Sequence, residues 1–185
     1  MTDRSRAHAP AERQLGAAAP DLEVRWVVAD DPLLQPLIDD LGRDYDARYE
    51  PTDGVPSSAE LTRYPPEEFA TERGGAFVAL LEDGALVAGG ALKRGRTGRD
   101  GRALGELKRM WTRSDRRRRG LAGRVLAELE GRGAELGYAE LELTTGARQP
   151  EAVALYLRHG WRPDFDLESD WEVVSYLRFT KLVRL

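Results

Sequence analysis

The sequence predicts a mixed α/β fold, with helices packed on a central sheet of both parallel and antiparallel strands. Two apolar runs, 76–81 and 86–92, are joined by Glu-Asp-Gly, which is typical of an antiparallel hairpin. Farther along the chain, helical patterns alternate with β-like runs, and consecutive strand–helix–strand units make neighbouring strands parallel. A hairpin and such units in one chain indicate a mixed sheet.

The first 75 residues predict one strand and two helices after a polar extension. Residues 1–20 are small, polar and aperiodic, so we interpret them as a disordered extension of a single domain spanning 21–185. Asp31 precedes leucines at helical spacing and suits a helix N-cap. The elements expected here are a strand at 24–28, a helix at 32–49, a loop at 50–58 and a short helix within 59–71.

The C-terminal half predicts alternating strands and helices. Pro150 suits the first turn of a helix, and Gly160 suits the left-handed cap at its end. After the hairpin, the expected elements are a polar turn at 95–101, a strand at 103–112, a helix at 120–135, a strand at 138–144, a helix at 150–159, a strand from 161 and a last strand at 171–182.

The main functional signal is the stretch 106–127, ELKRMWTRSDRRRRGLAGRVLA. Its strand ends in polar residues, and a helix then begins at Gly120 inside the basic run. A helix N-terminus carries unpaired N–H groups and a partial positive charge, and small residues such as Gly120 and Ala122 let the main chain approach a ligand closely. With Arg116–Arg119 added, the loop is suited to bind a polyphosphate. Neither G-x-x-x-x-G-K-(S/T) nor a strand followed by G-x-G-x-x-G is present.

A second block, GARQPEAVALYLRHGW at 146–161, carries Ala152, Leu155, Tyr156 and His159 on one helix face. The first motif, Arg117-x-x-Gly120-x-Ala122, resembles the acyl-CoA pyrophosphate motif (Q/R)-x-x-G-x-(G/A) of the GNAT superfamily of N-acetyltransferases. The second block resembles that family's N-x-x-A-x-x-L-Y-x-x-x-G-(F/Y), in the same order along the chain. Three positions depart from the family, because Gln149 replaces the asparagine, Arg118 stands where a second glycine of the loop is frequent, and Thr112 stands where valine is common.

The resemblance implies an α/β (α+β) fold with a central mixed, mostly antiparallel sheet of six to seven strands, about four flanking helices, and splayed fourth and fifth strands. It also implies acetyl-CoA as cosubstrate, with no metal. The residues expected to bind acetyl-CoA are Met110, Trp111, Thr112, Arg117, Arg118, Arg119, Gly120, Leu121, Ala122, Gly123 and Gln149.

The implied reaction is direct transfer of an acetyl group to a primary amine, without a covalent enzyme intermediate. Tyr156 would be the general acid that protonates the departing thiolate. Glu106 is the candidate base, directly or through water, and Glu140 and Glu142 are weaker alternatives. Each of these residues also has a structural alternative. Tyr156 could be an ordinary core tyrosine. Glu106 could be a sheet-surface carboxylate paired with a neighbouring lysine or arginine.

Acidic residues in 39–53 and 164–172 suggest a cationic small-molecule acceptor, although solvated loops would show the same pattern. The segment 93–124 carries a net charge of +10, whereas the whole chain carries −4. This basic centre in an acidic surround favours one anionic cofactor over nucleic acid. A catalytically inactive CoA-binding sensor and an arginine-rich nucleic-acid-binding module are the rival functions.

The composition limits the remaining possibilities. The chain has no cysteine and two histidines, so thiolate chemistry and a histidine-rich metal site are not expected. Without a long apolar run or an apolar N-terminal segment, we expect a cytoplasmic protein with no membrane partner. A monomer or a homodimer would both fit the sequence.

Overall fold

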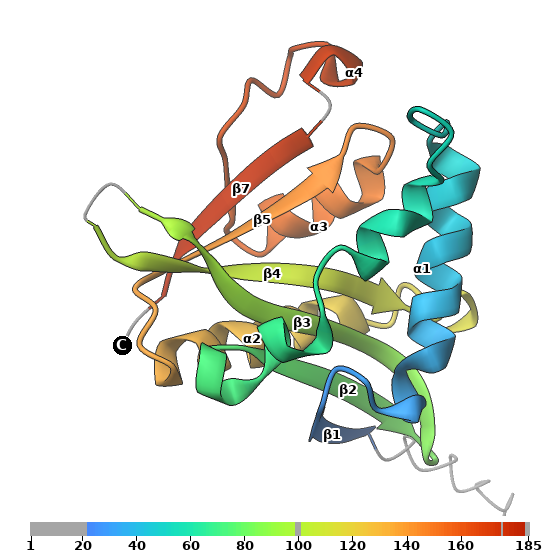
Figure 1. Ribbon diagram of the computed structural model, residues 1–185. Helices are drawn as coiled ribbons and strands as arrows, with labels where there is room; N and C mark the ends of the chain where they lie inside the picture. Colours follow the sequence, from blue (N-terminus) through green and yellow to red (C-terminus); the bar gives the residue numbers. More distant parts are fainter. Residues whose placement is uncertain (1–21, 99–100, 175, 184–185) are drawn as a thin grey trace, which may run out of the picture.

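The structure is a computed structural model that describes residues 22–98, 101–174 and 176–183. These residues form one seven-stranded sheet in the order β1-β2-β3-β4-β5-β7-β6 (Figure 1). Neighbouring strands run antiparallel, except β4 and β5, which run parallel. The predicted mixed, mostly antiparallel α/β (α+β) fold is thereby confirmed. The expected disordered extension, 1–20, lies outside the described residues.

The strands are β1 (Leu22–Val27), β2 (Ala76–Glu82), β3 (Ala85–Thr97), β4 (Ala103–Thr112), β5 (Glu140–Gly146), β6 (Arg162–Pro163) and β7 (Tyr176–Leu182). The α-helices are α1 (Gln35–Arg48), α2 (Leu121–Glu135), α3 (Pro150–Arg158) and α4 (Trp171–Val174). Short 3-10 helices are η1 (Pro32–Leu34), η2 (Ser57–Thr62), η3 (Pro66–Phe69), η4 (Thr71–Arg73) and η5 (Ser114–Arg116).

The sheet separates two apolar cores. Every residue of β2 is buried, because both faces of this strand are covered. Alternate side chains such as Phe77 and Ala79 pack with α1 and η2, whereas Val78 and Leu80 pack with α2. Figure 1 shows α1 and the 3-10 segments on one side of the sheet and α2 on the other. The two cores thus fix both faces of β4 and its neighbours.

Two local predictions are confirmed in atomic detail. Asp83 and Gly84 both have positive φ, 52° and 78°, as a two-residue type I′ hairpin turn between β2 and β3 requires. Asp31 caps the first helical segment, because its Oδ1 accepts a hydrogen bond from Leu33 N at 2.8 Å. That segment is η1 followed by α1, within the predicted range 32–49.

Three predicted elements differ from the structure. The short helix expected within 59–71 is instead the run of 3-10 turns η2, η3 and η4. Pro65 lies between η2 and η3 and Pro66 begins η3, and both lack the N–H that the interior of an α-helix needs. The last strand begins at Tyr176, because residues 171–174 form α4. β3 continues to Thr97 into the segment predicted to be a polar turn.

Within the described residues, no helix is both long and apolar enough to cross a bilayer. No group of three or more His, Asp or Glu side chains in the same part of the chain is arranged to hold a metal ion.

Candidate active site

The candidate site begins where β4 and β5 separate. The two strands pair only at Gly105–Leu107 against Leu141–Leu143, although β4 continues to Thr112 and β5 to Gly146. Figure 1 shows β5 and β7 turning away from β4 beyond this point. The predicted splay of the fourth and fifth strands is therefore confirmed. Backbone groups on the facing edges of both strands are left without a strand partner.

A bulge in β4 lies beside this opening. Ala91 of β3 pairs with Lys108 and Gly89 pairs with Trp111, so Arg109 and Met110 together oppose a single residue, Gly90. Arg109 has a φ of 55°, in the left-handed region. The bulge therefore frees main-chain groups at Arg109 and Met110 from the ladder with β3.

The Arg109 side chain anchors η2 to the bulge. Its guanidinium lies 4.4 Å from the centroid of the Phe69 ring, and its Nη2 donates a 2.7 Å hydrogen bond to the carbonyl oxygen of Leu61. Burial lowers the pKa of Arg109 from its ordinary value. Since arginine stays charged throughout the physiological range, this cation is a fixed element of the cavity wall.

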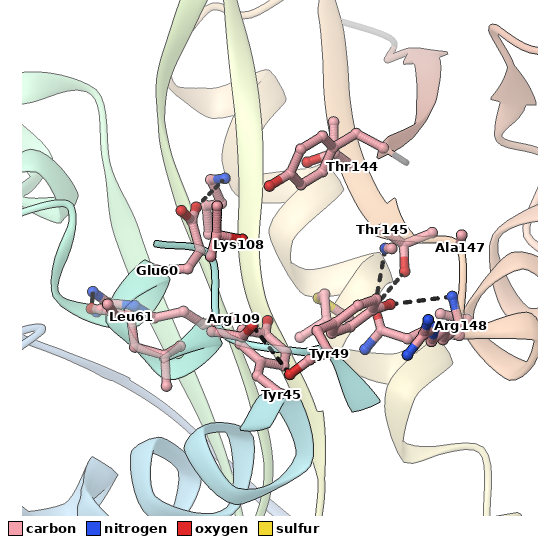
Figure 2. A pocket seen from close by; sticks show the side chains of 18 of the residues that line it. Tyr45, Tyr49, Glu60, Leu61, Lys108, Arg109, Thr144, Thr145, Ala147 and Arg148 are labelled. Carbon is pink, nitrogen blue, oxygen red and sulfur yellow. Dashed lines mark hydrogen bonds and ion pairs between the residues drawn. The ribbon is translucent and has the colours of Figure 1, made fainter. Parts of the chain in front are cut away.

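A cavity of about 640 Å³ occupies the splay. Figure 2 shows Glu60 and Lys108 at one wall, Thr144–Arg148 at the opposite wall, and Tyr45 and Tyr49 of the α1 end between them. Of the predicted site residues, Met110, Gln149 and Tyr156 line this cavity. The sequence did not indicate the wall residues Tyr45, Tyr49, Glu60, Lys108 and Arg148.

Tyr156 lies on α3, with 5% of its surface exposed. Its ring packs against Phe179 at 5.4 Å and Trp161 at 6.3 Å between centroids, which fixes its orientation. Burial raises the pKa of Tyr156 far above its ordinary value of 10.0, and the neighbouring Tyr45 raises it further. No hydrogen bond to the Tyr156 hydroxyl occurs within the described residues, so this protonated phenol is available to a ligand in the cavity.

Gln149 shapes the loop between β5 and α3. Its Oε1 accepts hydrogen bonds from Thr145 Oγ1 at 2.8 Å and from Gly146 N at 3.1 Å. The glutamine that replaces the family's asparagine thus ties the loop to the end of β5. Gln149 lines the cavity, and its amide nitrogen makes no hydrogen bond among the described residues, so it can donate to a ligand.

Glu106 lies on β4 between two lysines, with 17% of its side chain exposed. Its carboxylate is 3.1 Å from Lys108 Nζ and 3.6 Å from Lys93 Nζ. Glu60 binds the same Lys108 ammonium at 3.3 Å. Glu60 lines the cavity and Glu106 does not, so Lys108 separates the predicted base from the cavity.

The other two carboxylates proposed as bases are placed differently. Glu142 is nearly buried, and it accepts hydrogen bonds from Arg96 at 2.8 Å and from Arg178 at 2.9 Å. Neither Glu140 nor Glu142 lines the cavity. Among the predicted bases, Glu106 is therefore the nearest along the chain to the cavity wall.

The predicted phosphate loop follows directly after β4. Gly120 is the N-cap of α2 with a φ of 79°, and the first intrahelical bond runs from Arg124 N to Gly120 O. Among the described residues, the six consecutive N–H groups from Arg118 to Gly123 have no hydrogen-bond acceptor. The dipole of α2 adds partial positive charge at the same place, so an anion fits these groups.

The small residues of the loop have distinct roles. A Cβ at Gly123 would lie 2.6 Å from the His159 ring, so glycine allows α2 and the end of α3 to approach closely. Leu121, by contrast, is buried with Val125 in the core between α2 and the sheet. Its backbone N–H, rather than its side chain, is therefore the group that can meet a ligand.

The four consecutive arginines divide into two pairs. Arg116 Nε donates to Glu82 Oε2 at 2.7 Å, and Arg119 Nη2 donates to Glu82 Oε1 at 2.6 Å. The side chains of Arg117 and Arg118 make no hydrogen bond or ion pair among the described residues, and both residues are exposed. The predicted phosphate ligands Arg117 and Arg118 are thus available, whereas the Arg119 side chain is engaged at the end of β2.

The carboxylate of Glu82 is strongly acidic. Hydrogen bonds from Arg119, and then from Arg116, lower the pKa of Glu82 from 4.5 to about 2. Because the folded-state pKa lies below the unfolded one, this contact stabilises the fold fully above about pH 4.5. That stabilisation is lost as the pH falls toward about 2.

The end of β4 combines a satisfied and an unsatisfied polar group. Trp111 is buried in the α1 core, and its Nε1 donates to Asp40 Oδ2 at 3.3 Å. The next residue, Thr112, has a buried Oγ1 for which the described residues provide no hydrogen-bond partner. At Met110–Thr112, the predicted contacts to acetyl-CoA therefore fall to backbone groups.

Replacing Thr112 with valine is expected to raise the free energy of unfolding by about 1 kcal/mol, because a buried hydroxyl without a partner costs roughly that much. Valine keeps the shape and the strand preference. Thr145→Val is a matched control with the opposite expectation, since Thr145 Oγ1 donates to Gln149. Chemical denaturation of both variants measures the difference, and destabilisation by Thr112→Val would show that its hydroxyl has a partner in solution.

The splayed sheet, the unpaired amides at the start of α2 and the phenol on α3 agree with the features expected from the resemblance to GNAT acetyltransferases. The profile of the acetyltransferase (GNAT) family matches residues 38–161. Because this match covers more than half of the chain, the protein belongs to the acetyltransferase (GNAT) family.

Solved structures of low sequence identity share the fold. An acetyltransferase from Streptococcus agalactiae 2603 superposes with a TM-score of 0.66 at 17% identity, over 88% of this chain and 98% of that one. A GNAT-family acetyltransferase from Staphylococcus aureus Mu50 gives 0.66 at 15% identity, over 89% and 100% of the two chains. A GNAT superfamily phosphinothricin acetyltransferase from Sinorhizobium meliloti, solved in complex with AcCoA, gives 0.60 at 19% identity and covers 88% of each chain. No curated protein matches the sequence.

Proposed function

We propose that the protein is an N-acetyltransferase that transfers the acetyl group of acetyl-CoA to a primary amine. The observation that carries this proposal is the continuity of β4 from the cavity to the loop. The bulge at Arg109 and Met110 lines the cavity with Tyr156, and the same strand leads into the six unpaired N–H groups. One strand therefore connects a site for a diphosphate with a site for acyl transfer.

The residues present fit acetyl-CoA. The N–H groups of residues 118–123 and the side chains of Arg117 and Arg118 would hold the pyrophosphate. Backbone groups near Met110 and Thr112, on the edge of β4 that β5 leaves beyond Leu107, would bind the pantetheine arm and polarise the thioester carbonyl. Gln149 would add a donor from the opposite wall.

The chemistry supplied by acetyl-CoA is an activated acyl group, whose C–S bond breaks as the C–N bond to the amine forms. The amine must lose a proton, and the departing thiolate must gain one. Tyr156 is suited to donate because burial keeps its phenol protonated. We assign Glu106 as the base, acting through water. Glu60, the second carboxylate that pairs with the Lys108 ammonium, lines the cavity.

The acceptor is proposed to be a cationic small molecule with a primary amine. Of the acidic segments 39–53 and 164–172, Glu50 and Glu172 line the cavity. Glu172 is paired with Arg148 at 2.9 Å, whereas Glu50 has no ion pair among the described residues. Asp164 is instead held by Arg178. The support for a positive charge on the acceptor therefore comes from the cavity rim around Glu50.

Thermal denaturation with acetyl-CoA, followed by thiol release over a panel of amines, tests the proposal. At 100 times its dissociation constant, acetyl-CoA is expected to add about 2.7 kcal/mol of stability. Di- and polyamines are expected to release thiol faster than neutral or carboxylate-bearing amines. Stabilisation without thiol release would indicate a sensor. Stabilisation by a short DNA duplex but not by acetyl-CoA would indicate a nucleic-acid module.

A further inference from the structure

Glu82 is a buried carboxylate that connects β2 to the phosphate loop. It is the last residue of β2, with 7% of its surface exposed, directly before the hairpin turn. It accepts three hydrogen bonds, from Arg116 Nε at 2.7 Å and from Arg119 Nη1 and Nη2 at 3.1 and 2.6 Å. A buried charge is tolerated when it is paired in this way. The loop is thereby fastened to a rigid strand of the sheet.

The two arginines bound by Glu82 flank the two that are unpaired. Between the two anchored side chains, Arg118 has a φ of 63°, in the left-handed region that non-glycine residues rarely adopt. Gly120 follows with a φ of 79°. A strained backbone conformation of this kind persists when the surrounding structure holds it in place. The anchors at Arg116 and Arg119 provide that restraint on both sides of Arg118.

The same contacts determine which arginine side chains of the loop are available to a ligand. Two guanidinium groups are engaged by Glu82, and the two unengaged ones, Arg117 and Arg118, are exposed next to the unpaired N–H groups. The loop therefore presents a defined pair of arginines to an anion, instead of four that compete for it.

We propose that Glu82 is a positioning residue of the acetyl-CoA site. It holds the loop in the conformation that exposes the N–H groups of residues 118–123, and it withdraws Arg116 and Arg119 from the ligand, so that Arg117 and Arg118 contact the phosphates. This inference rests on the proposed function, because it assumes that acetyl-CoA binds at this loop. Glu82 itself does not touch the ligand.

Isothermal titration of acetyl-CoA into single and double variants at pH 7 tests the inference. Glu82→Gln, Arg117→Met and Arg118→Met are each expected to weaken binding about tenfold or more, as expected when a hydrogen bond to a charged group is lost. Glu128→Gln is the matched control, because it breaks the exposed pair with Arg124 on α2 and is expected to leave the affinity unchanged. Circular dichroism verifies that each variant is folded.

A double-mutant cycle separates positioning from a general loss of stability. Glu82→Gln combined with Arg119→Met is expected to bind no more weakly than Glu82→Gln alone, because both changes break one anchor. Glu82→Gln combined with Arg117→Met is expected to lose less than the product of the two single losses, because Glu82 acts partly by placing Arg117. A loss from Arg119→Met that multiplies fully with that of Glu82→Gln would show that Arg119 binds the ligand, and a fully multiplicative loss from Arg117→Met would show that Glu82 does not place Arg117; either result would overturn the inference.

The outcomes also separate this inference from the proposed function. If the wild-type protein binds no acetyl-CoA, the proposed function fails and this inference fails with it. If the wild type binds acetyl-CoA and folded Glu82→Gln binds it equally well, the positioning role of Glu82 is refuted while the proposed function stands.

Discussion

Replacing Tyr156 with phenylalanine is expected to lower kcat for acetyl transfer by about 10²- to 10⁴-fold, the usual contribution of a general acid. The phenol lines the cavity on α3, and burial raises its pKa, so it remains protonated across the pH range in which amines react. Phenylalanine keeps the ring packing against Phe179 and Trp161 and removes the hydroxyl alone. Affinity for acetyl-CoA should therefore be preserved.

Steady-state thiol release and calorimetric binding of acetyl-CoA measure the two quantities separately. Tyr45→Phe is the matched control, because Tyr45 is a second tyrosine in the same cavity whose pKa is also raised by burial. The control should retain most of the wild-type kcat, since its hydroxyl lies on α1 and has no assigned proton transfer. An unchanged kcat in Tyr156→Phe would remove this residue from the mechanism.

The features that could be predicted from the sequence are those that neighbouring residues determine. Asp31 caps the segment that directly follows it, and Asp83–Gly84 forms its turn through the backbone preferences of those two residues. The start of α2 at Gly120 likewise depends on one short loop. The two motifs predicted the order of elements and the splay because both lie within continuous stretches of chain.

The features that could not be predicted depend on segments far apart in the sequence. Glu60 meets Lys108 although the two are 48 positions apart in the sequence, and no local pattern marks either as a cavity residue. The bulge at Arg109 depends on the register between β3 and β4, which is set by packing on both faces of the sheet. Glu82 resembles an ordinary turn-flanking residue until the fold brings Arg116 and Arg119 to it.

The arginine run illustrates this difference in one motif. Its position before α2 correctly predicted a basic loop with free N–H groups. From the sequence alone, the four neighbouring arginines cannot be told apart. In the fold, two of them have an acidic partner among the described residues and two do not. The engagement of Arg116 and Arg119 by Glu82 is a tertiary contact, and it changes which side chains are available to an anion.

The second large effect is expected from Gly146→Ala at the end of β5. A Cβ at Gly146 would lie 2.0 Å from the Tyr49 hydroxyl oxygen and 2.6 Å from Tyr49 Cζ, so the tyrosine ring would have to move. That hydroxyl accepts a 3.2 Å hydrogen bond from Arg148 N. Arg48 and Arg148 add reciprocal contacts, each donating from Nη1 to the other's carbonyl oxygen at 2.7 Å.

These contacts join the end of α1 to the β5–α3 loop across the splay. Because β5 leaves β4 after Leu143, this clamp of Arg48, Tyr49, Gly146 and Arg148 is what bridges the two cavity walls there. Overpacking at such a contact costs about 1–3 kcal/mol. We therefore expect Gly146→Ala to lower the stability by that amount and to raise KM for the amine, since Tyr49 and Arg148 line its proposed site.

A double variant and a matched glycine substitution distinguish the clash from a general effect of alanine. Adding Tyr49→Leu to Gly146→Ala should recover part of the stability, because the smaller side chain makes room for the new methyl group. Gly131→Ala on α2 has no atom within 4 Å of the added Cβ, and we expect it to stabilise the helix by about 1 kcal/mol with KM unchanged. Thermal denaturation and amine kinetics report both quantities. Fully additive losses in the double variant would show that Gly146 and Tyr49 do not pack against each other, and that the clamp does not set the width of the cavity.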